Sequence, residues 1–430
     1  MTSRWEWLWM QFTRRLWVRA GLISLLAVVA VGLAGLLQDF IPDDFAARIG
    51  AGSVDDILSI LASSMLAVTT FSLTTMVSAY AAATSQVTPR ATRLLREDTT
   101  TQNVLATFIG SFLFALLGIV ALATGLYGDQ GRVTLFVFTI GVIALIVVTL
   151  LRWIEHLSAF GRVDDTTRRV EEAAAQALDA WVAAPCLGAR ALRDAQDIPR
   201  DATALFDTRI GYVQHIDVGV LQAWAEEHGG EVFMLVVPGS YVEPSQPVAW
   251  VTGGGAADAE ALLGEALVVA HARSFYQDPR FGLAVLAEIA SRALSPAVND
   301  PATAIDVIGR AVRVLSRCAG NDGLPGDETR CTRVAIPALD VGDFFNDVFA
   351  PIARDGAALV EVHIRLHKAL AMLARQGPPL SAPARRLASF ALAHAEAALV
   401  LEEDRAVVRR LAGVVANAGA GDGLRRSERA

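Results

Sequence analysis

Four long apolar segments lie within the first 160 residues of the chain, and no segment of that length follows them. A run of about 20 apolar residues can cross the hydrocarbon core of a bilayer as a helix. The four segments, 17–37, 57–82, 104–126 and 133–154, all reach that length. The pattern therefore predicts a four-helix transmembrane domain over residues 1–160, followed by a large water-soluble region.

The second apolar segment has an unusual polar pattern. Between residues 55 and 88 there is no proline or glycine, so we expect one continuous helix of roughly 50 Å, at about 1.5 Å per residue. That length exceeds a hydrocarbon core of roughly 30 Å. Hydroxyl-bearing residues recur along it at spacings of four and seven, which places them on one helical face. We call this set the hydroxyl stripe: Ser59, Ser63, Thr70, Thr74, Ser78 and Ser85.

Two interpretations of the hydroxyl stripe remain open. Small and hydroxyl side chains allow helices to approach closely in a membrane, so the stripe suits a packing seam between helices or subunits. A polar face can also form the wall of a pathway for ions or small solutes, completed by copies of the same helix. The stripe contains no acid, base or histidine. Since proton relays and ion-coupled transporters usually place ionisable groups inside the membrane, a pump or secondary transporter is disfavoured.

The arginines predict the topology. Cytoplasmic loops carry an excess of Lys and Arg. Arginines gather before the first segment, between the second and third, and after the fourth, whereas the other two loops are acidic or nearly neutral. Both termini and the C-terminal region are therefore expected in the cytoplasm of a bacterial inner-membrane protein. The arginines concerned are Arg4, Arg14, Arg15, Arg19, Arg90, Arg93, Arg96, Arg152, Arg162, Arg168 and Arg169.

The region 161–418 alternates between helical and strand-like patterns. Residues 164–181 are helical by propensity, and short β-type runs follow at 209–220, 231–237 and 247–252. The runs predict a small β-barrel or sandwich insert at about 209–252, between helices. The fold class is thus a mainly α polytopic membrane protein with a cytoplasmic α+β domain, and the tail 419–430 is expected to be disordered.

The most distinctive local sequence of this region is QDPRFGLAVLAEIASRALSPAVNDPATA. Asp300 followed by Pro301 suits the start of a helix, and Pro296 marks the end of the preceding one. A helix–turn–helix accounts for most of these residues. A functional alternative is a polar cluster that binds a small anion or docks the long second helix. The candidate residues are Arg273, Gln277, Asp278, Arg292, Asn299 and Asp300.

Composition excludes several function classes. Of the 430 residues, 53% are hydrophobic and 19% charged, and the net charge of −8 argues against nucleic-acid binding. The only lysine is Lys368, so no phosphate-binding GxxxxGK[ST] loop exists. His363 and His367 have helical spacing for a metal, but no further ligand accompanies them, and we expect surface histidines there. We predict no catalytic residue, no metal and no cofactor, and hence not an enzyme.

Two motifs carry a family resemblance. The run FSLTTMVSAYAAATSQVTPRATRLLREDTTTQNVLATFIGSFLFALLGI resembles the second and third spans of the DUF2254 family, bacterial predicted membrane proteins of unknown function. The run QDPRFGLAVLAEIASRALSPAVNDPATA resembles the other hallmark of that family. The chain departs from the pattern at Val87-Thr88, where Phe-Ser is frequent, and at Ala297-Val298, where Gly-Ile is common. The resemblance implies fold and location, and it implies no activity.

From these patterns we expect a homo-oligomer in the lipid bilayer. The leading functional hypothesis is a gated passive pore for ions or small solutes, lined by the second transmembrane helix and controlled by the cytoplasmic domain. The alternative is a membrane scaffold or sensor that transports nothing, in which the same helix is an oligomerisation seam.

Overall fold

The computed structural model describes residues 51–96, 98–124, 129–254, 256–321 and 329–418, with scattered residues between 18 and 33. The chain divides into two compact units. We call Leu8–Thr166 the N-terminal unit and Thr167–Ala430 the C-terminal unit, and we describe each by itself.

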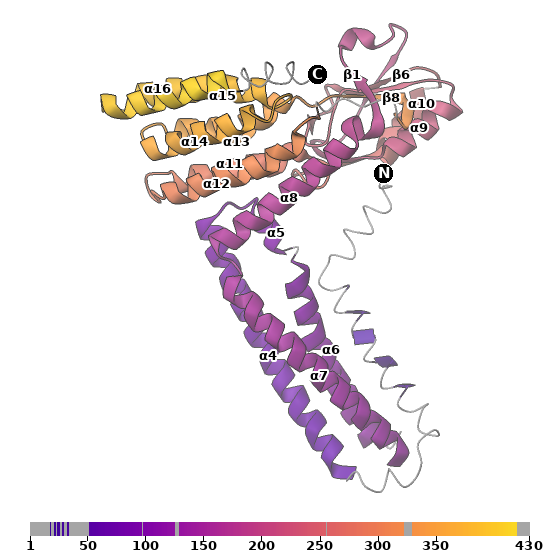
Figure 1. Cartoon of the computed structure of the whole chain (residues 1–430). Helices are drawn as coiled ribbons and strands as arrows, with labels where there is room; N and C mark the ends of the chain where they lie inside the picture. Colours follow the sequence, from indigo (N-terminus) through magenta and orange to yellow (C-terminus); the bar gives the residue numbers. More distant parts are fainter. Residues whose placement is uncertain are drawn as a thin grey trace, which may run out of the picture. The chain divides into compact units, whose positions relative to one another are not determined.

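Long helices make up the described part of the N-terminal unit (Figure 1). Three stretches in the described residues are long and apolar enough to span a membrane: Val54–Ala82, Thr92–Ala123 and Gln130–Leu157. They match the second, third and fourth predicted spans. The predicted first span, 17–37, lies mostly outside the described residues. The helices are α4 (Ala51–Gln86), α5 (Thr92–Arg96), α6 (Thr99–Ala123) and α7 (Asp129–Ala159).

Helix α4 is the continuous helix that its sequence predicts. It contains 36 residues, which corresponds to about 54 Å at 1.5 Å per residue. It ends shortly before Pro89, whose ring disfavours helical backbone at the preceding residue. Asp98 is the N-cap of α6, and its carboxylate accepts a hydrogen bond from the backbone N–H of Thr101. Helix α6 packs against both α4 and α7, and it approaches α4 closely at Gly118, where a Cβ would lie 2.9 Å from Leu58.

The C-terminal unit contains two small β-sheets with helices beside them. A five-stranded sheet has the order β1-β8-β4-β6-β2, in which β8 is parallel to both β1 and β4, and the pairs that contain β6 are antiparallel. An antiparallel three-stranded sheet has the order β5-β3-β7. The strands are β1 (Ala189–Leu192), β2 (Thr203–Phe206), β3 (Gly211–Ile216), β4 (Val232–Met234), β5 (Tyr241–Val242), β6 (Pro247–Val251), β7 (Leu267–Ala270) and β8 (Cys331–Pro337).

These sheets differ in two respects from the predicted insert at 209–252. Strands β1, β2, β7 and β8 come from outside that range, so the sheets combine segments far apart in the sequence. The run predicted as one strand over 209–220 also changes to helix at Asp217. The carboxylate of Asp217 accepts hydrogen bonds from the N–H groups of Gly219 and Val220 and caps α9 (Val218–Glu227). This N-cap ends the strand at Asp217, although apolar residues stand on both sides of it.

Six helices of the C-terminal unit form three stacked pairs (Figure 1). Neighbouring contacts run from α11 to α13 to α15 in one layer, and from α12 to α14 to α16 in the other. Each pair contacts the next, as in helical-repeat proteins. The remaining helices of the unit are α8 (Val163–Ala183), which begins before the boundary between the units, and α10 (Ala256–Ala266). The stacked helices are α11 (Pro279–Ala293), α12 (Pro301–Leu315), α13 (Val341–Asp355), α14 (Val360–Ala374), α15 (Ser381–Ala398) and α16 (Glu402–Asn417).

Helix α8 packs against the first pair of this stack. A Cβ on Gly282 of α11 would lie 2.4 Å from the Cβ of Ala174 in α8, so only glycine permits this helix–helix approach. The carboxylate of Glu171 in α8 binds Arg310 and Arg313 of α12. Close packing and ion pairs together hold α8 on the stack. The predicted tail, 419–430, lies outside the described residues.

Candidate functional site

The hydroxyl stripe lies on the exposed face of α4. Ser59, Ser63, Thr70, Thr74 and Ser78 are all exposed, and the side chain of Ser85 lies outside the described residues. The opposite face of α4 is buried against α6 and α7. Its buried residues are Val54, Leu58, Leu61, Ala62, Met65 and Ser72.

Local hydrogen bonds satisfy the hydroxyl donors of Ser63, Thr70 and Thr74 in the stripe. The hydroxyl of Thr70 donates to the carbonyl of Leu66 at 2.9 Å, and that of Thr74 to the carbonyl of Thr70 at 3.0 Å. The Ser63 hydroxyl lies 3.0 Å from the carbonyl of Ser59. Bonds of this kind let Ser and Thr reside in apolar surroundings without an unpaired donor. The oxygen lone pairs of the stripe still face outward and can accept hydrogen bonds from a solute, water or another helix.

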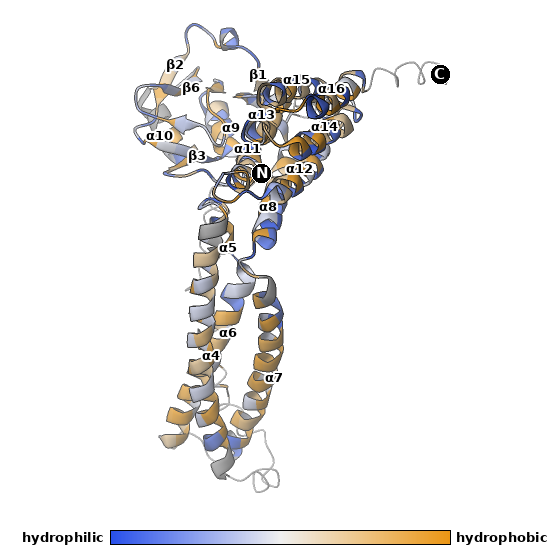
Figure 2. Ribbon diagram, turned by 90° about the vertical axis from the view of Figure 1, so that its left-hand side faces the viewer, coloured by the Kyte–Doolittle hydropathy of each residue, from blue (hydrophilic) through white to orange (hydrophobic). Residues whose placement is uncertain are grey.

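Helix α7 presents a different surface. Figure 2 shows α7 coloured as hydrophobic along most of its length, whereas α4 carries many pale and hydrophilic positions. A mainly aliphatic face of this kind suits contact with lipid. The large residues exposed on α7 are Val137, Ile140, Leu145, Val147, Val148, Leu151 and Ile154.

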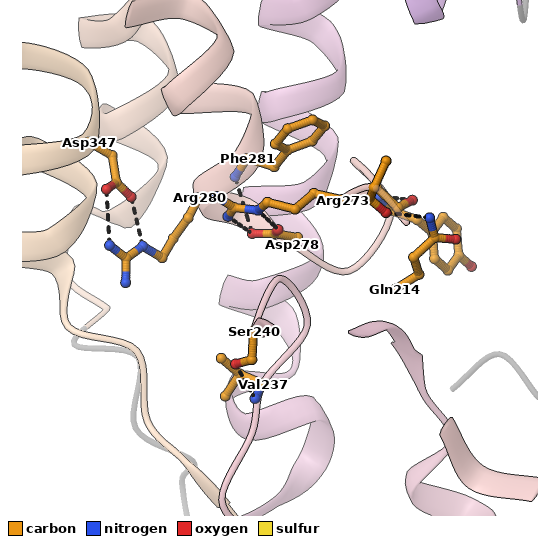
Figure 3. Close-up of polar contacts among 11 residues, drawn as sticks. Gln214, Val237, Ser240, Arg273, Asp278, Arg280, Phe281 and Asp347 are labelled. Carbon is orange, nitrogen blue, oxygen red and sulfur yellow. Dashed lines mark hydrogen bonds and ion pairs between the residues drawn. The ribbon is translucent and has the colours of Figure 1, made fainter. Parts of the chain in front are cut away.

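The polar cluster predicted around α11 has a structural role. Arg273 donates two hydrogen bonds to the carboxylate of Asp278, from Nε at 2.7 Å and from an Nη at 2.8 Å (Figure 3). The same carboxylate caps α11 by accepting from the N–H of Phe281 at 3.1 Å. Burial raises the pKa of Asp278, and the hydrogen bonds from Arg273 counteract part of that rise. The guanidinium is therefore engaged with an internal carboxylate, which leaves less of its charge for an external anion.

The other residues of the predicted polar cluster do not contact the Arg273–Asp278 pair through their side chains in any of the following interactions. The side-chain oxygen of Gln277 accepts a hydrogen bond from the N–H of Ile216 and so holds the end of β3. Asp300 caps α12 by accepting from the N–H and hydroxyl of Thr303, as its sequence predicts. Asn299 is exposed, with a positive φ of 51° in the turn between the helices. Asp278 and Arg292 lie at opposite ends of α11, which at 15 residues is about 22 Å long. The six residues thus form two structural groups and do not converge on one site.

The neighbouring residue of the motif, Arg280, also has a structural partner. Its guanidinium binds Asp347 through two hydrogen bonds of 2.7 and 3.0 Å (Figure 3). It binds Asp343 through a further hydrogen bond of 2.9 Å. Both aspartates belong to α13. Arg280 therefore fastens the first pair of helices in the stack to the second. The motif QDPRFG is explained by capping, by this ion pair and by the close approach at Gly282.

The prediction that His363 and His367 are surface residues was wrong. Both are fully buried, with exposed fractions of 0%. Helix α14 packs against α12, α15 and α16, and this stacking covers the face that carries the histidines. Neither ring nitrogen of His363 has a hydrogen-bond partner in the described part of the chain. Burial, together with the neighbouring His367 and His394, lowers the pKa of His363 to about 4.

The described residues contain no cluster of three or more His, Cys, Asp or Glu side chains that could hold a metal ion. The three cysteines, Cys186, Cys318 and Cys331, are buried free thiols. Burial raises the pKa of Cys186 to about 11 and that of Cys318 to about 12, so these sulfurs stay protonated and poorly nucleophilic. The regular spacing and exposure of its hydroxyl residues make the hydroxyl stripe the candidate functional surface.

Comparison with known proteins agrees with the motifs. The model of a family described as predicted membrane protein (DUF2254) matches residues 13–372. The chain belongs to the DUF2254 family. The match extends from the first predicted span through most of α14, so both the hydroxyl stripe and the α11–α12 motif lie within the DUF2254 region.

Curated DUF2254-like relatives come from mycobacteria. Uncharacterized proteins of Mycobacterium tuberculosis (strain ATCC 25618 / H37Rv) and Mycobacterium bovis (strain ATCC BAA-935 / AF2122/97) are each 27% identical to the chain over 321 residues, which covers 70% of the chain and 61% of the relative. The chain thus spans about three fifths of the length of the relatives it matches. No solved structure matches it.

Proposed function

We propose that this protein is a homo-oligomeric, passive pore of a bacterial inner membrane, in which copies of α4 line a pathway for ions or small solutes. The observation that carries the proposal is the exposure of every described residue of the hydroxyl stripe on the N-terminal unit. The described residues of one chain do not cover this polar face, and copies of α4 around a central axis would enclose it. Hydroxyl oxygens along such an axis could replace part of the hydration shell of a passing solute.

The proposal includes a passive mechanism without catalysis. No ionisable residue belongs to the stripe, and membrane pumps usually depend on such residues. We further infer that both termini and the C-terminal unit are cytoplasmic, on the basis of the arginine distribution. A C-terminal unit in that position could control opening.

A second candidate function rests on the same face. Because the hydroxyls of Thr70 and Thr74 already donate to their own backbone, the stripe could pack against another copy of α4 without any solute. The protein would then be a scaffold or sensor whose stripe serves only for assembly. Both functions require other copies of the chain, and they differ in whether water reaches the stripe.

Leucine substitution distinguishes the two. We would replace Thr70, Thr74 and Ser78 by leucine together, and compare flux in a planar bilayer with the oligomeric state in detergent. A pore whose wall becomes aliphatic is expected to lose conductance and retain assembly. A packing seam is expected to lose assembly, because the leucine side chains prevent close approach.

A matched control comes from the same exposed face. Phe71 and Val77 are exposed apolar residues beside the stripe, and changing both to leucine alters bulk without removing a hydroxyl. That variant should retain conductance and assembly. If the triple-leucine protein conducts and assembles like the wild type, the stripe faces lipid, and both candidate functions are wrong.

A further inference from the structure

The buried face of α4 contacts the end of α7, at the point where the chain leaves the N-terminal unit. Three residues of α4 and three at the end of α7 make these contacts. We call them the coupling joint: Ser72, Ala79 and Tyr80 from α4, with Trp153, Phe160 and Gly161 from α7 and the turn that follows it.

A buried hydrogen bond forms the first contact of the joint. The indole Nε1 of Trp153 donates to the hydroxyl of Ser72 at 3.0 Å. Trp153 is 2% exposed and Ser72 is 0% exposed. An indole N–H buried among apolar helices needs an acceptor, and losing it would leave a donor unpaired. This hydrogen bond joins two residues that are 81 positions apart in sequence, one in α4 and one in α7.

Aromatic contacts form the second part. The rings of Tyr80 and Phe160 meet edge to face, with centroids 5.7 Å apart. The Tyr80 hydroxyl donates to the carbonyl of Leu95 at 2.9 Å, which fixes the ring. On the same face of α7, the ring of His156 lies between those of Trp153 and Phe160, with centroids 5.7 and 5.1 Å away. Its Nε2 lies 3.0 Å from the carboxylate of Asp98, the residue that caps α6. The end of α7 is thus held to α4 and α6 by directional contacts, which restrict rotation more than aliphatic packing does.

Gly161 makes the closest backbone contact. Its φ of +80° favours glycine, and a Cβ there would lie 3.0 Å from the carbonyl oxygen of Ala79. The turn after α7 therefore lies directly against α4. From this turn the chain continues into α8, which begins at Val163.

The joint lies opposite the hydroxyl stripe. At 3.6 residues per turn, Ser72 and Ala79 are turned by about 140–180° around the helix from Thr70 and Thr74. Ser78 is turned by only about 100–120° from them, so it forms the edge of the stripe nearest the joint. We propose that the coupling joint makes α4 move together with α7, so that a displacement of the chain where it enters the C-terminal unit changes the orientation of the stripe. A role of the joint in gating rests on the proposed function, because turning the stripe changes a pathway only if the stripe lines that pathway.

Distance measurements between the two helices test the joint without any need for conduction. Spin labels would be placed at the exposed residues Val77 of α4 and Val147 of α7 in full-length protein whose three buried cysteines are alanine, diluted with unlabelled chain. With an intact joint we expect one narrow distance distribution. Ser72→Ala, Trp153→Phe and Gly161→Ala should each broaden it or add a second maximum.

Matched controls remove equivalent groups outside the joint. The hydroxyl of Ser64 bonds within α4 to the carbonyl of Leu61, and a Cβ on Gly141 of α7 meets nothing within 4 Å. Ser64→Ala and Gly141→Ala should therefore leave the distribution narrow. Ser72→Ala removes only one oxygen atom, so it keeps the test valid if a larger change prevents folding.

The outcomes separate the joint from the pore. If folded joint variants retain the narrow distribution, the contacts are ordinary packing and the inference is wrong. If the distribution broadens and the conductance of the same variants changes, coupling and the pore are both supported. If it broadens while neither wild type nor variants conduct, the joint stands and the pore proposal fails.

Discussion

From the burial of His363 we predict that the folded protein loses stability in acid. The imidazole is fully buried, neither ring nitrogen has a partner in the described structure, and the pKa is lowered to about 4 from an ordinary 6.5. In the unfolded chain the same group titrates at its ordinary pKa. Between these two values the unfolded state binds more protons, so stability falls as the pH falls through 6.5 and stops falling below about 4.

The magnitude follows from the two pKa values. At pH 7.5 both states are neutral at His363, and the contribution is close to zero. At pH 5 the unfolded chain is mostly protonated and the folded chain mostly is not, which corresponds to about 2 kcal/mol. For a unit of this size that amounts to a decrease of roughly 4–8 °C in the unfolding temperature.

The assay compares full-length wild type with His363→Leu in detergent by thermal unfolding at pH 7.5, 6 and 5. Leucine fills the buried site and cannot be protonated. The wild type should lose about 2 kcal/mol more than the variant between pH 7.5 and pH 5, because every other titrating group is common to both. His271→Gln, a change at an exposed histidine, should behave like the wild type. A difference between wild type and His363→Leu that stays constant with pH would refute the reasoning.

Three further predictions concern the C-terminal unit. Gly282→Val should destabilise it by about 1–3 kcal/mol in thermal unfolding, because the added side chain overpacks the contact with α8. Arg280→Gln should lower the free energy of unfolding by about 1 kcal/mol, because it removes the two hydrogen bonds to Asp347 at a partly exposed site. The thiols of Cys186 and Cys318 should resist iodoacetamide at pH 8 in native protein and react once it is unfolded, as mass spectrometry can measure.

Controls for these predictions lie in the same unit. Gly264→Val places a side chain where a Cβ meets nothing within 4 Å. No loss of stability is expected, because valine has a helix propensity no lower than that of glycine. Arg354→Gln breaks an exposed pair with Asp355 and should change stability little. Equal losses in each variant and its control would contradict the packing and ion-pair explanations. Rapid alkylation of native protein would show that the cysteines are accessible.

Sequence periodicity predicted the elements whose signal is local. The α4 helix follows from an unbroken run without proline or glycine, and the α11–α12 turn follows from capping at Asp300 with Pro301 behind it. The hydroxyl stripe was visible as a spacing, because residues on one helical face recur every three to four positions. These features need no information from distant parts of the chain.

Features that depend on distant segments were not predictable in this way. The spacing of His363 and His367 is the same on a surface helix and on a covered one, and only the stacking of α14 between other helices decides that they are buried. Arg273 and Asp278 suggested an anion site until their mutual hydrogen bonds were seen. The extent of the sheets depended on pairing β8 with β1, which lies more than a hundred residues earlier.

The sequence by itself determined three candidate membrane-spanning segments, the long α4 helix with its polar face, and the family. These result from hydrophobicity and helical geometry, which act over neighbouring residues. Only the tertiary structure decided which face of α4 is covered, where Trp153 finds its acceptor in Ser72, and which charged residues neutralise one another. Burial and pairing depend on segments brought together by folding, and periodicity along one segment carries no information about its partners.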